Sequence, residues 1–321
     1  MLSRREILIG TGMAGVAALA RPVANAFAIA AQPKMPVNFT VPDGACDSHT
    51  CIVADPAKFP LAADRGYTPE TASLDEMRAV HRALHIQRVV IVQPSFYGTD
   101  SSCTLDTVKQ LGPNARGVVL IADNTTNAEL DQLRRGGICG IICAASEAHS
   151  NPEAVRNLYK IAVERCQGRG WHVEFHGGLP EIEMIAEQVM DSSVPVIFDH
   201  FGGAKPALGL NQPGFDTLLK LVHSGHAYAD ASAPYRVSKQ APDYPDVMPI
   251  AKAIIAANPQ RVTWGTGWPH PEHIDGYSKT QPVPLMQIDD ARNLNLLNTW
   301  TSGPAELKLA LVENPARLYG F

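Results

Sequence analysis

Charged residues are scarce in this sequence, and neither sign is clustered. Asp, Glu, Lys and Arg make up 18% of the 321 residues, and 27 basic against 32 acidic side chains leave a formal net charge of -5. No run of Lys and Arg is long enough to follow a phosphate backbone, so nucleic acid is not an expected partner. The remaining composition, with 45% hydrophobic residues, is that of a globular protein with enough chain for a large core.

Long apolar runs are also missing, apart from a short one near the N-terminus. Paired Arg4 and Arg5 are followed by TGMAGVAALA and by Ala-x-Ala at 24–26 and 26–28. Because this run is short, rich in small residues and ends in a cleavage site, it predicts a secretory leader over residues 1–26. The arginine pair resembles a twin-arginine export signal, so we expect a periplasmic or secreted protein with no membrane segment in its mature form. The alternative is an uncleaved N-terminal anchor helix.

Cysteine is too sparse for a disulfide framework in a chain of this length. Export would place the thiols in an oxidising compartment, where pairing is permitted. We expect buried free thiols that act as small hydrophobic side chains, with disulfide pairing as the alternative. The six residues are Cys46, Cys51, Cys103, Cys139, Cys143 and Cys166.

After a Pro- and Ala-rich arm or linker over 27–43, short β-branched runs alternate with segments of helical spacing. The strand candidates cover residues 45–53, 87–95, 115–122, 137–145, 171–177, 194–202, 226–235 and 261–268. The helix candidates cover 74–85, 127–136, 152–166, 179–190, 214–224, 245–259, 289–300 and 303–321. Eight strands alternating with helices predict a single-domain (β/α)8 barrel, a TIM barrel, over residues 44–321. A doubly wound open sheet is the alternative, but no Gly-rich phosphate loop follows any strand.

Catalysis in such barrels takes place at the carboxyl ends of the strands, where this sequence places several histidines. His49, His176 and His200 follow the first, fifth and sixth strands, and His270 and His273 follow the eighth. We expect His49, His176, His200 and His270 to share one mouth, because alternating strand residues point to the same face. The alternative is a set of core histidines that hydrogen-bond to the backbone.

Five motifs carry a family resemblance: DSHTCIV, VIFDHFGG, SAPYRVS with YPDV, WGTGWPHP and ENPARLYGF. In order and spacing they resemble the metal-independent branch of the amidohydrolase superfamily, the 2-pyrone-4,6-dicarboxylate lactonase-like group. The resemblance covers nearly all of residues 44–321. It implies a (β/α)8 barrel that binds a small anionic lactone or similar cyclic ester and opens it with water.

The sequence departs from the family pattern at five positions. Cys51 replaces the second histidine of D-x-H-x-H, and Gly267 replaces the acid of W-G-[TS]-D-W-P-H-P. Cys139 and Ile142 stand where the fourth strand commonly carries arginines, and Asp230 stands where the seventh often carries a lysine. The resemblance therefore implies a site without its usual general base and with fewer cations, which favours a less charged, more apolar ligand.

The missing acid must be replaced if the protein is a hydrolase, because general-base catalysis contributes about 10²- to 10⁴-fold. The candidates are Asp230, Glu272, Asp275 and the histidines of the mouth, with His200 first because it lies at a strand end and has a suitable ordinary pKa. We therefore predict that the catalytic residues are His49, His200 and His270. The predicted substrate-binding residues are His176, Ser232, Tyr235, Arg236 and Trp268.

The resemblance implies no cofactor and no metal. The wider superfamily holds its ions with both histidines of H-x-H, a strand-four lysine, histidines on strands five and six, and the strand-eight acid. A single zinc at His49, Cys51 and His176 is the alternative, since thiolate and imidazole are good zinc ligands.

The predicted function is an exported hydrolase of lactone or related carboxylated compounds that acts through histidines of the mouth. A catalytically silent barrel that binds a small molecule is one alternative. A non-hydrolytic lyase, decarboxylase or isomerase on the same scaffold is another, because barrels accept new chemistry at their strand ends. The sequence does not indicate an oligomeric state.

Overall fold

Eight parallel strands form the centre of the molecule, as the alternating pattern predicts. The computed structural model describes residues 30–145 and 151–321, so the expected leader over 1–26 lies outside the described residues. The strand order is β1-β3-β4-β5-β6-β7-β8-β9, with every neighbouring pair parallel. These first to eighth barrel strands are β1 (Cys46–Thr50), β3 (Arg88–Val92), β4 (Ala115–Val119), β5 (Ile138–Cys143), β6 (His172–Phe175), β7 (Val196–Phe198), β8 (Ala227–Asp230) and β9 (Val262–Thr263).

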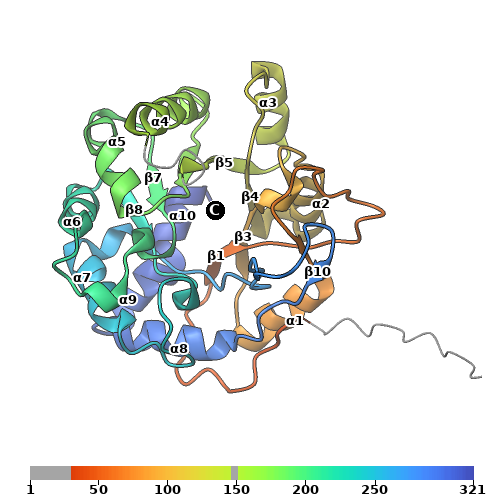
Figure 1. The fold of residues 1–321 in the computed structure, drawn as a ribbon. Helices are drawn as coiled ribbons and strands as arrows, with labels where there is room; N and C mark the ends of the chain where they lie inside the picture. The colour runs from red at the N-terminus through yellow and green to blue at the C-terminus, as the bar shows by residue number, and fades with distance from the viewer. Residues whose placement is uncertain (1–29, 146–150) are drawn as a thin grey trace, which may run out of the picture.

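Backbone hydrogen bonds join the first strand to the residues directly after the last strand and so close the ring. The amide of Ser48 donates to the carbonyl of Trp264 at 2.9 Å, and the amide of Gly267 donates to the carbonyl of His49 at 2.8 Å. Figure 1 shows the strands around a common centre with the helices outside them. The predicted TIM barrel is therefore confirmed, and the open doubly wound sheet is wrong.

The helices begin where the sequence supplies caps and an apolar stripe. Ser73 and Thr126 each form a capping box with the glutamate three residues later, which satisfies free amides of the first turn. The helix absent from our expectations, α2, buries Cys103, Thr104 and Thr107 beside Val108, so its inner face is weakly hydrophobic. The helices are α1 (Leu74–Leu84), α2 (Ser102–Leu111), α3 (Asn127–Arg135), α4 (Pro152–Cys166), α5 (Leu179–Asp191), α6 (Phe215–Ser224), α7 (Val247–Ala257), α8 (Asp290–Trp300), α9 (Pro304–Lys308) and α10 (Asn314–Tyr319).

The C-terminus closes the end of the barrel where the strands begin. Leu318 and Tyr319 are buried against inward-facing side chains of the strands. The guanidinium carbons of Arg88 and Arg116, which lie at the starts of β3 and β4, are 5.2 and 4.7 Å from the ring centre of Phe321. The chain end accordingly lies at the centre of the ring in Figure 1. A small molecule must therefore enter from the opposite end, where the strands finish.

A two-stranded sheet at the open end was not expected from the sequence. It pairs β2 (Thr68–Pro69) with β10 (Pro282–Val283), and the hydroxyl of Thr68 donates to the carbonyl of Lys279 at 2.6 Å. It ties the loop after β1 to the loop after β9.

All six cysteines are unpaired and buried, as expected. Among the described residues, no helix is both long and apolar enough to cross a membrane.

Candidate active site

A cavity of about 700 Å³ opens where the strands end. His49 reaches it from β1, His176 and His200 follow β6 and β7, and Arg236 belongs to the short helix η6 (Pro234–Arg236) after β8. Trp268, in the loop after β9, forms part of the wall. The structure therefore brings five of the eight predicted site residues to one cavity.

Three carboxylates surround the imidazole of His49 at the floor of this cavity. Its Nδ1 lies 3.3 Å from Glu174 Oε1, 3.8 Å from Asp230 Oδ2 and 3.9 Å from Asp199 Oδ1. Asp199 also approaches His176, with 2.7 Å between its Oδ2 and His176 Nε2. We name this set, His49, Glu174, His176, Asp199 and Asp230, the floor cluster.

The floor cluster makes His49 cationic at neutral pH. Burial by itself lowers the pKa of an imidazole, but the carboxylates of Asp199, Glu174 and Asp230 outweigh it and raise the pKa of His49 to about 9. A charged imidazolium at a cavity floor can donate a hydrogen bond to an oxygen that gains negative charge.

Two of the three acids, Glu174 and Asp230, differ in their protonation at neutral pH. Burial raises the pKa of Glu174, but its hydrogen bond with His172 and its ion pair with His49 outweigh burial and hold the pKa well below its usual range. Burial raises the pKa of Asp230 to about 7, although the charge of His49 opposes the rise. Glu174 is therefore ionised at neutral pH, whereas Asp230 titrates near it.

His200 is neutral where His49 is charged. Burial lowers its pKa well below the usual value, and the positive charges of His49 and Arg236 lower it further. Its Nδ1 lies 2.8 Å from the hydroxyl of Ser232, and its ring centre lies 4.8 Å from that of His49. Ser232, predicted to bind substrate, is fully buried and not part of the cavity lining, so its contact is with His200.

His270 does not reach the shared mouth, which corrects our expectation for the fourth histidine. It is fully buried and absent from the cavity lining. Its Nε2 lies 3.1 Å from Asp290 Oδ2 and its Nδ1 lies 3.2 Å from the hydroxyl of Tyr235. Tyr235 is also outside the lining, and its hydroxyl donates to the carbonyl of Gly267 at 3.2 Å. His270 and Tyr235 therefore contact the loop after β9 and the start of α8.

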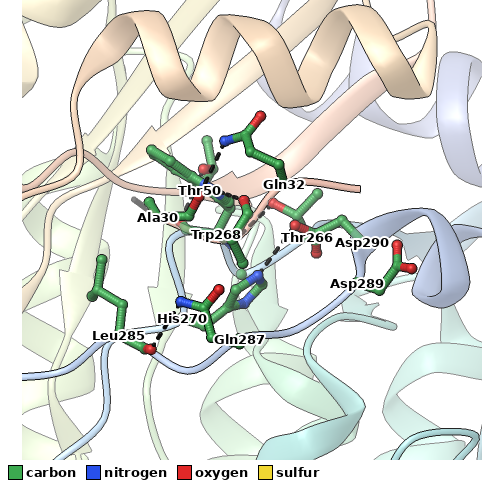
Figure 2. A network of polar contacts seen from close by, with 12 residues as sticks. Ala30, Gln32, Thr50, Thr266, Trp268, His270, Leu285, Gln287, Asp289 and Asp290 are labelled. Atoms are coloured by element: carbon green, nitrogen blue, oxygen red, sulfur yellow. Dashed lines mark hydrogen bonds and ion pairs between the residues drawn. The ribbon is translucent and has the colours of Figure 1, made fainter. Parts of the chain in front are cut away.

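Trp268 is held by polar contacts from three segments, most of which appear in Figure 2. Its amide donates to the hydroxyl of Thr266, and its carbonyl accepts from the hydroxyl of Thr50, each at 3.0 Å. Its indole Nε1 donates to the carbonyl of Ala31 at 3.0 Å. The described part of the N-terminal arm thus packs against the cavity wall, and Ala30 and Ala31 are buried there.

The position of the missing acid is sterically occupied. Gly267 has a φ of +72°, and a Cβ there would lie 2.9 Å from Tyr235 Oη and 3.0 Å from Ala233 Cβ. Both distances are shorter than a normal contact. Gly267 is therefore favoured by the local backbone and packing, and it lines the cavity without a side chain.

Of the other residues that depart from the family pattern, one lines the cavity and two are buried away from it. Cys51 lines the cavity, and burial raises the pKa of its thiol to about 12, so it is protonated at neutral pH. Cys139 and Ile142 are buried and outside the lining. Among the described residues, two groups place three donor atoms within 4.8 Å of one another: His49, Asp199 and His200, and Glu174, His176 and Asp199. Neither contains Cys51, so the structure does not assemble the zinc set of His49, Cys51 and His176.

The acids considered as a replacement base are not equivalent. Asp230 is buried behind His49 and outside the lining, whereas Glu272 lines the cavity and lies 3.7 Å from Arg236. Asp275 is fully exposed and also outside the lining. The acid that reaches the cavity beside the histidines is Asp199.

Sequence reasoning missed two acids and two cations of the site. Glu174 alternates with His172 and His176 along WHVEFH, so period-two spacing could have placed it on the inner face. Asp199 directly precedes His200 in the motif VIFDHFGG, but it was given no role. Lys205 and Lys239 line the cavity from loops, which have no comparable periodicity.

Together these features define a (β/α)8 barrel with a histidine and carboxylate site at the carboxyl ends of its strands. The chain belongs to the amidohydrolase family, whose pattern matches residues 46–321. It is 32% identical over 285 residues to 4-sulfomuconolactone hydrolase of Hydrogenophaga intermedia, covering 89% of this chain and 91% of the relative.

Two further comparisons support the same family and fold. The chain is 30% identical to 2-pyrone-4,6-dicarboxylate hydrolase of Comamonas testosteroni, with 90% of this chain and 94% of the relative covered. A crystal structure from Agrobacterium tumefaciens superposes with a TM-score of 0.75 at 26% identity, covering 89% of this chain and 99% of that one.

Proposed function

We propose that the protein is a lactonase that hydrolyses a small cyclic ester carrying an acidic group. The observation that carries this proposal is the convergence of charged His49, neutral His200 and cationic Arg236 on one cavity. Two similar proteins are named as hydrolases of a sulfomuconolactone and of a pyrone dicarboxylate.

His49 stabilises the oxyanion in this proposal. Glu174 and the other floor carboxylates occupy the side of its Nδ1, which leaves Nε2 as the nitrogen free to meet a ligand. The imidazolium donates a hydrogen bond to the lactone carbonyl oxygen, and this bond strengthens as negative charge develops there.

His200 acts as the general base and then as the general acid. Ser232 holds its Nδ1, so Nε2 of the neutral ring accepts a proton from water as the water oxygen bonds to the carbonyl carbon. When the ring C–O bond breaks, the same proton passes to the departing oxygen. One water is consumed, and the product is a hydroxy acid.

Cations at the mouth support an acidic substituent and revise our expectation of a more apolar ligand. Arg236 donates to the carbonyl of Pro271 at 3.2 Å, and its guanidinium faces the cavity together with Lys205 and Lys239. Guanidinium pairs well with carboxylate or sulfonate oxygens. These cations take over the role that Cys139 and Ile142 cannot perform.

The floor cluster also fits a divalent cation, because several of its buried donor atoms have no hydrogen-bond partner. Glu174, His176 and Asp199 would hold such an ion, which would supply Lewis-acid polarisation of the carbonyl.

Lactone hydrolysis is tested with the purified mature protein and anionic lactones, by following ring opening and acid release. The variants His49→Asn and His200→Asn should each lower kcat/KM by about 10²- to 10⁴-fold. His223→Asn, an exposed position on α6, is the matched control and should leave turnover unchanged. If wild-type protein binds these lactones without opening them, the silent binding barrel replaces this proposal.

We also propose that the protein is exported through the twin-arginine route. The sequence of residues 1–28 supports this. Fractionation of cells that express wild type or an Arg4→Lys, Arg5→Lys variant tests it, and equal periplasmic amounts would contradict it.

A further inference from the structure

The floor cluster contains more negative charge and more unsatisfied polar atoms than its own residues can balance. Glu174, Asp199 and Asp230 are each at least nine-tenths buried and approach one imidazolium, that of His49. A buried carboxylate without a counter-charge is unfavourable by several kcal/mol. Even with Asp230 partly protonated near neutral pH, two acids face one imidazolium, so the cluster favours an additional cation.

Unpartnered atoms point into this cluster from four different strand ends. His49 Nδ1, His176 Nε2, Asp199 Oδ1 and Asp230 Oδ2 are buried without a hydrogen-bond partner. The short separation of 2.7 Å between His176 and Asp199 lacks the alignment of a hydrogen bond. Buried polar atoms are normally satisfied, and a bound ion is one of the recognised reasons for an exception.

The donor atoms lie close enough together to share one small ion. One donor atom each from Glu174, His176 and Asp199 lies within 4.8 Å of the other two, and ligands about 2.1 Å from a tetrahedral ion lie about 3.4 Å apart. His176 Nε2 and Asp199 Oδ2, which are 2.7 Å apart, would separate slightly on ion binding. His172 Nε2 lies 3.3 Å from Glu174 Oε2, which orients the other oxygen of that carboxylate toward the cluster.

We propose that Glu174, His176 and Asp199 bind one divalent metal ion, and that the two carboxylates replace the strand-eight acid lost at Gly267. This ligand set differs from the superfamily pattern, because its acids come from β6 and the end of β7 and it uses neither Cys51 nor a strand-four lysine. Two carboxylates and one imidazole suit Zn²⁺ or Mn²⁺ better than a soft thiophilic ion.

The test measures ion binding and does not depend on the proposed lactonase activity. The full-length mature protein is stripped with a chelator, dialysed, and titrated with Zn²⁺ and separately with Mn²⁺ by calorimetry, with the bound metal counted by elemental analysis. We expect one ion per chain. Asp199→Asn removes the donor shared by both candidate groups and should weaken binding by more than about 100-fold.

A matched control and a second ligand variant keep the result interpretable. Cys51→Ser changes a side chain of the same cavity that is outside the proposed ligand set, and it should bind the ion as wild type does. Glu174→Gln should weaken binding as Asp199→Asn does, and thermal melting of each stripped variant shows whether it is folded. Absence of stoichiometric binding to wild type, or loss of binding in Cys51→Ser with retention in folded Asp199→Asn, would overturn the proposal.

Discussion

Substitution of Gly267 by alanine should destabilise the fold, because two separate terms oppose a side chain there. The first is backbone strain, since the φ of +72° lies in the left-handed region, which costs an L-residue about 1–2 kcal/mol. The second is crowding, because the new Cβ would lie 2.9 Å from Tyr235 Oη. The hydroxyl of Tyr235 cannot move freely, since it contacts the carbonyl of Gly267 and His270 Nδ1.

The two terms can be separated with a matched glycine in the same loop. Gly276 has a φ of +91° but nothing within 4 Å of its hypothetical Cβ, so Gly276→Ala adds strain without crowding. Overpacking costs about 1–3 kcal/mol. We therefore expect Gly267→Ala to lower the free energy of unfolding by about 2–5 kcal/mol and Gly276→Ala by about 1–2 kcal/mol.

Urea unfolding followed by tryptophan fluorescence measures both variants, with reversibility checked by dilution. A double-mutant cycle with Tyr235→Phe adds a second test, because removal of the hydroxyl should reduce the loss at Gly267. Equal destabilisation by Gly267→Ala and Gly276→Ala, with no coupling to Tyr235→Phe, would refute the crowding argument. Gly267→Asp should be at least as destabilising as Gly267→Ala, so restoring the family acid should not restore a working base.

Three further predictions concern stability. His270→Ala leaves its buried carboxylate partner unpaired and should lower the free energy of unfolding by more than about 3 kcal/mol in urea melts; a smaller loss would show that the pair is weak. Starting the chain at residue 33 removes the Ala31 carbonyl that accepts from Trp268, which should cost about 1–3 kcal/mol relative to a chain starting at residue 30; equal melting temperatures would contradict this. The third prediction concerns protein treated with a chelator, in which the pKa of His49 is raised from 6.5 to about 9. The protonated imidazole therefore stabilises the fold fully below pH 6.5, and this stabilisation is lost as the pH rises through 9. Urea melts across this range should show the loss in wild type, and the free energy of unfolding should change less steeply with pH in His49→Asn.

The barrel could be predicted from the sequence because both of its periods are visible there. β-branched runs such as QRVVIVQPS alternate with segments such as PEAVRNLYKIAVERC, and each became one strand or one helix. The prediction failed where the hydrophobic periodicity of the local sequence is weak. The inner face of α2 consists largely of cysteine and threonine, and the paired strands β2 and β10 are each two residues long.

The site was predictable for side chains that lie in a strand or next to its end. His49 lies in β1, His176 directly follows β6, and His200 begins the short helix η4 (His200–Gly203) just after β7; all three reach the cavity. His270 stands further along the chain, in the turn after β9. Its φ of 64° turns the backbone out of the extended conformation, so strand alternation does not apply to it. The contact between His270 and Asp290 joins residues from different parts of the fold, and no spacing in the sequence predicts it.

The acid that is missing at Gly267 and the acids that follow or end the neighbouring strands are related. At Gly267 the backbone conformation and Tyr235 exclude a side chain, so that strand end cannot present a carboxylate. Asp199 and Asp230 provide carboxylates from the adjacent β7 and β8 side of the same floor, within 4 Å of His49. A divalent ion beside these buried acids favours their ionised forms, so its binding should displace the proton that Asp230, with a pKa of about 7, holds near neutral pH. Ion binding in this protein should therefore release protons, a coupling that calorimetry in buffers of different ionisation enthalpy measures directly, and buffer-independent heats would contradict this account of the floor cluster.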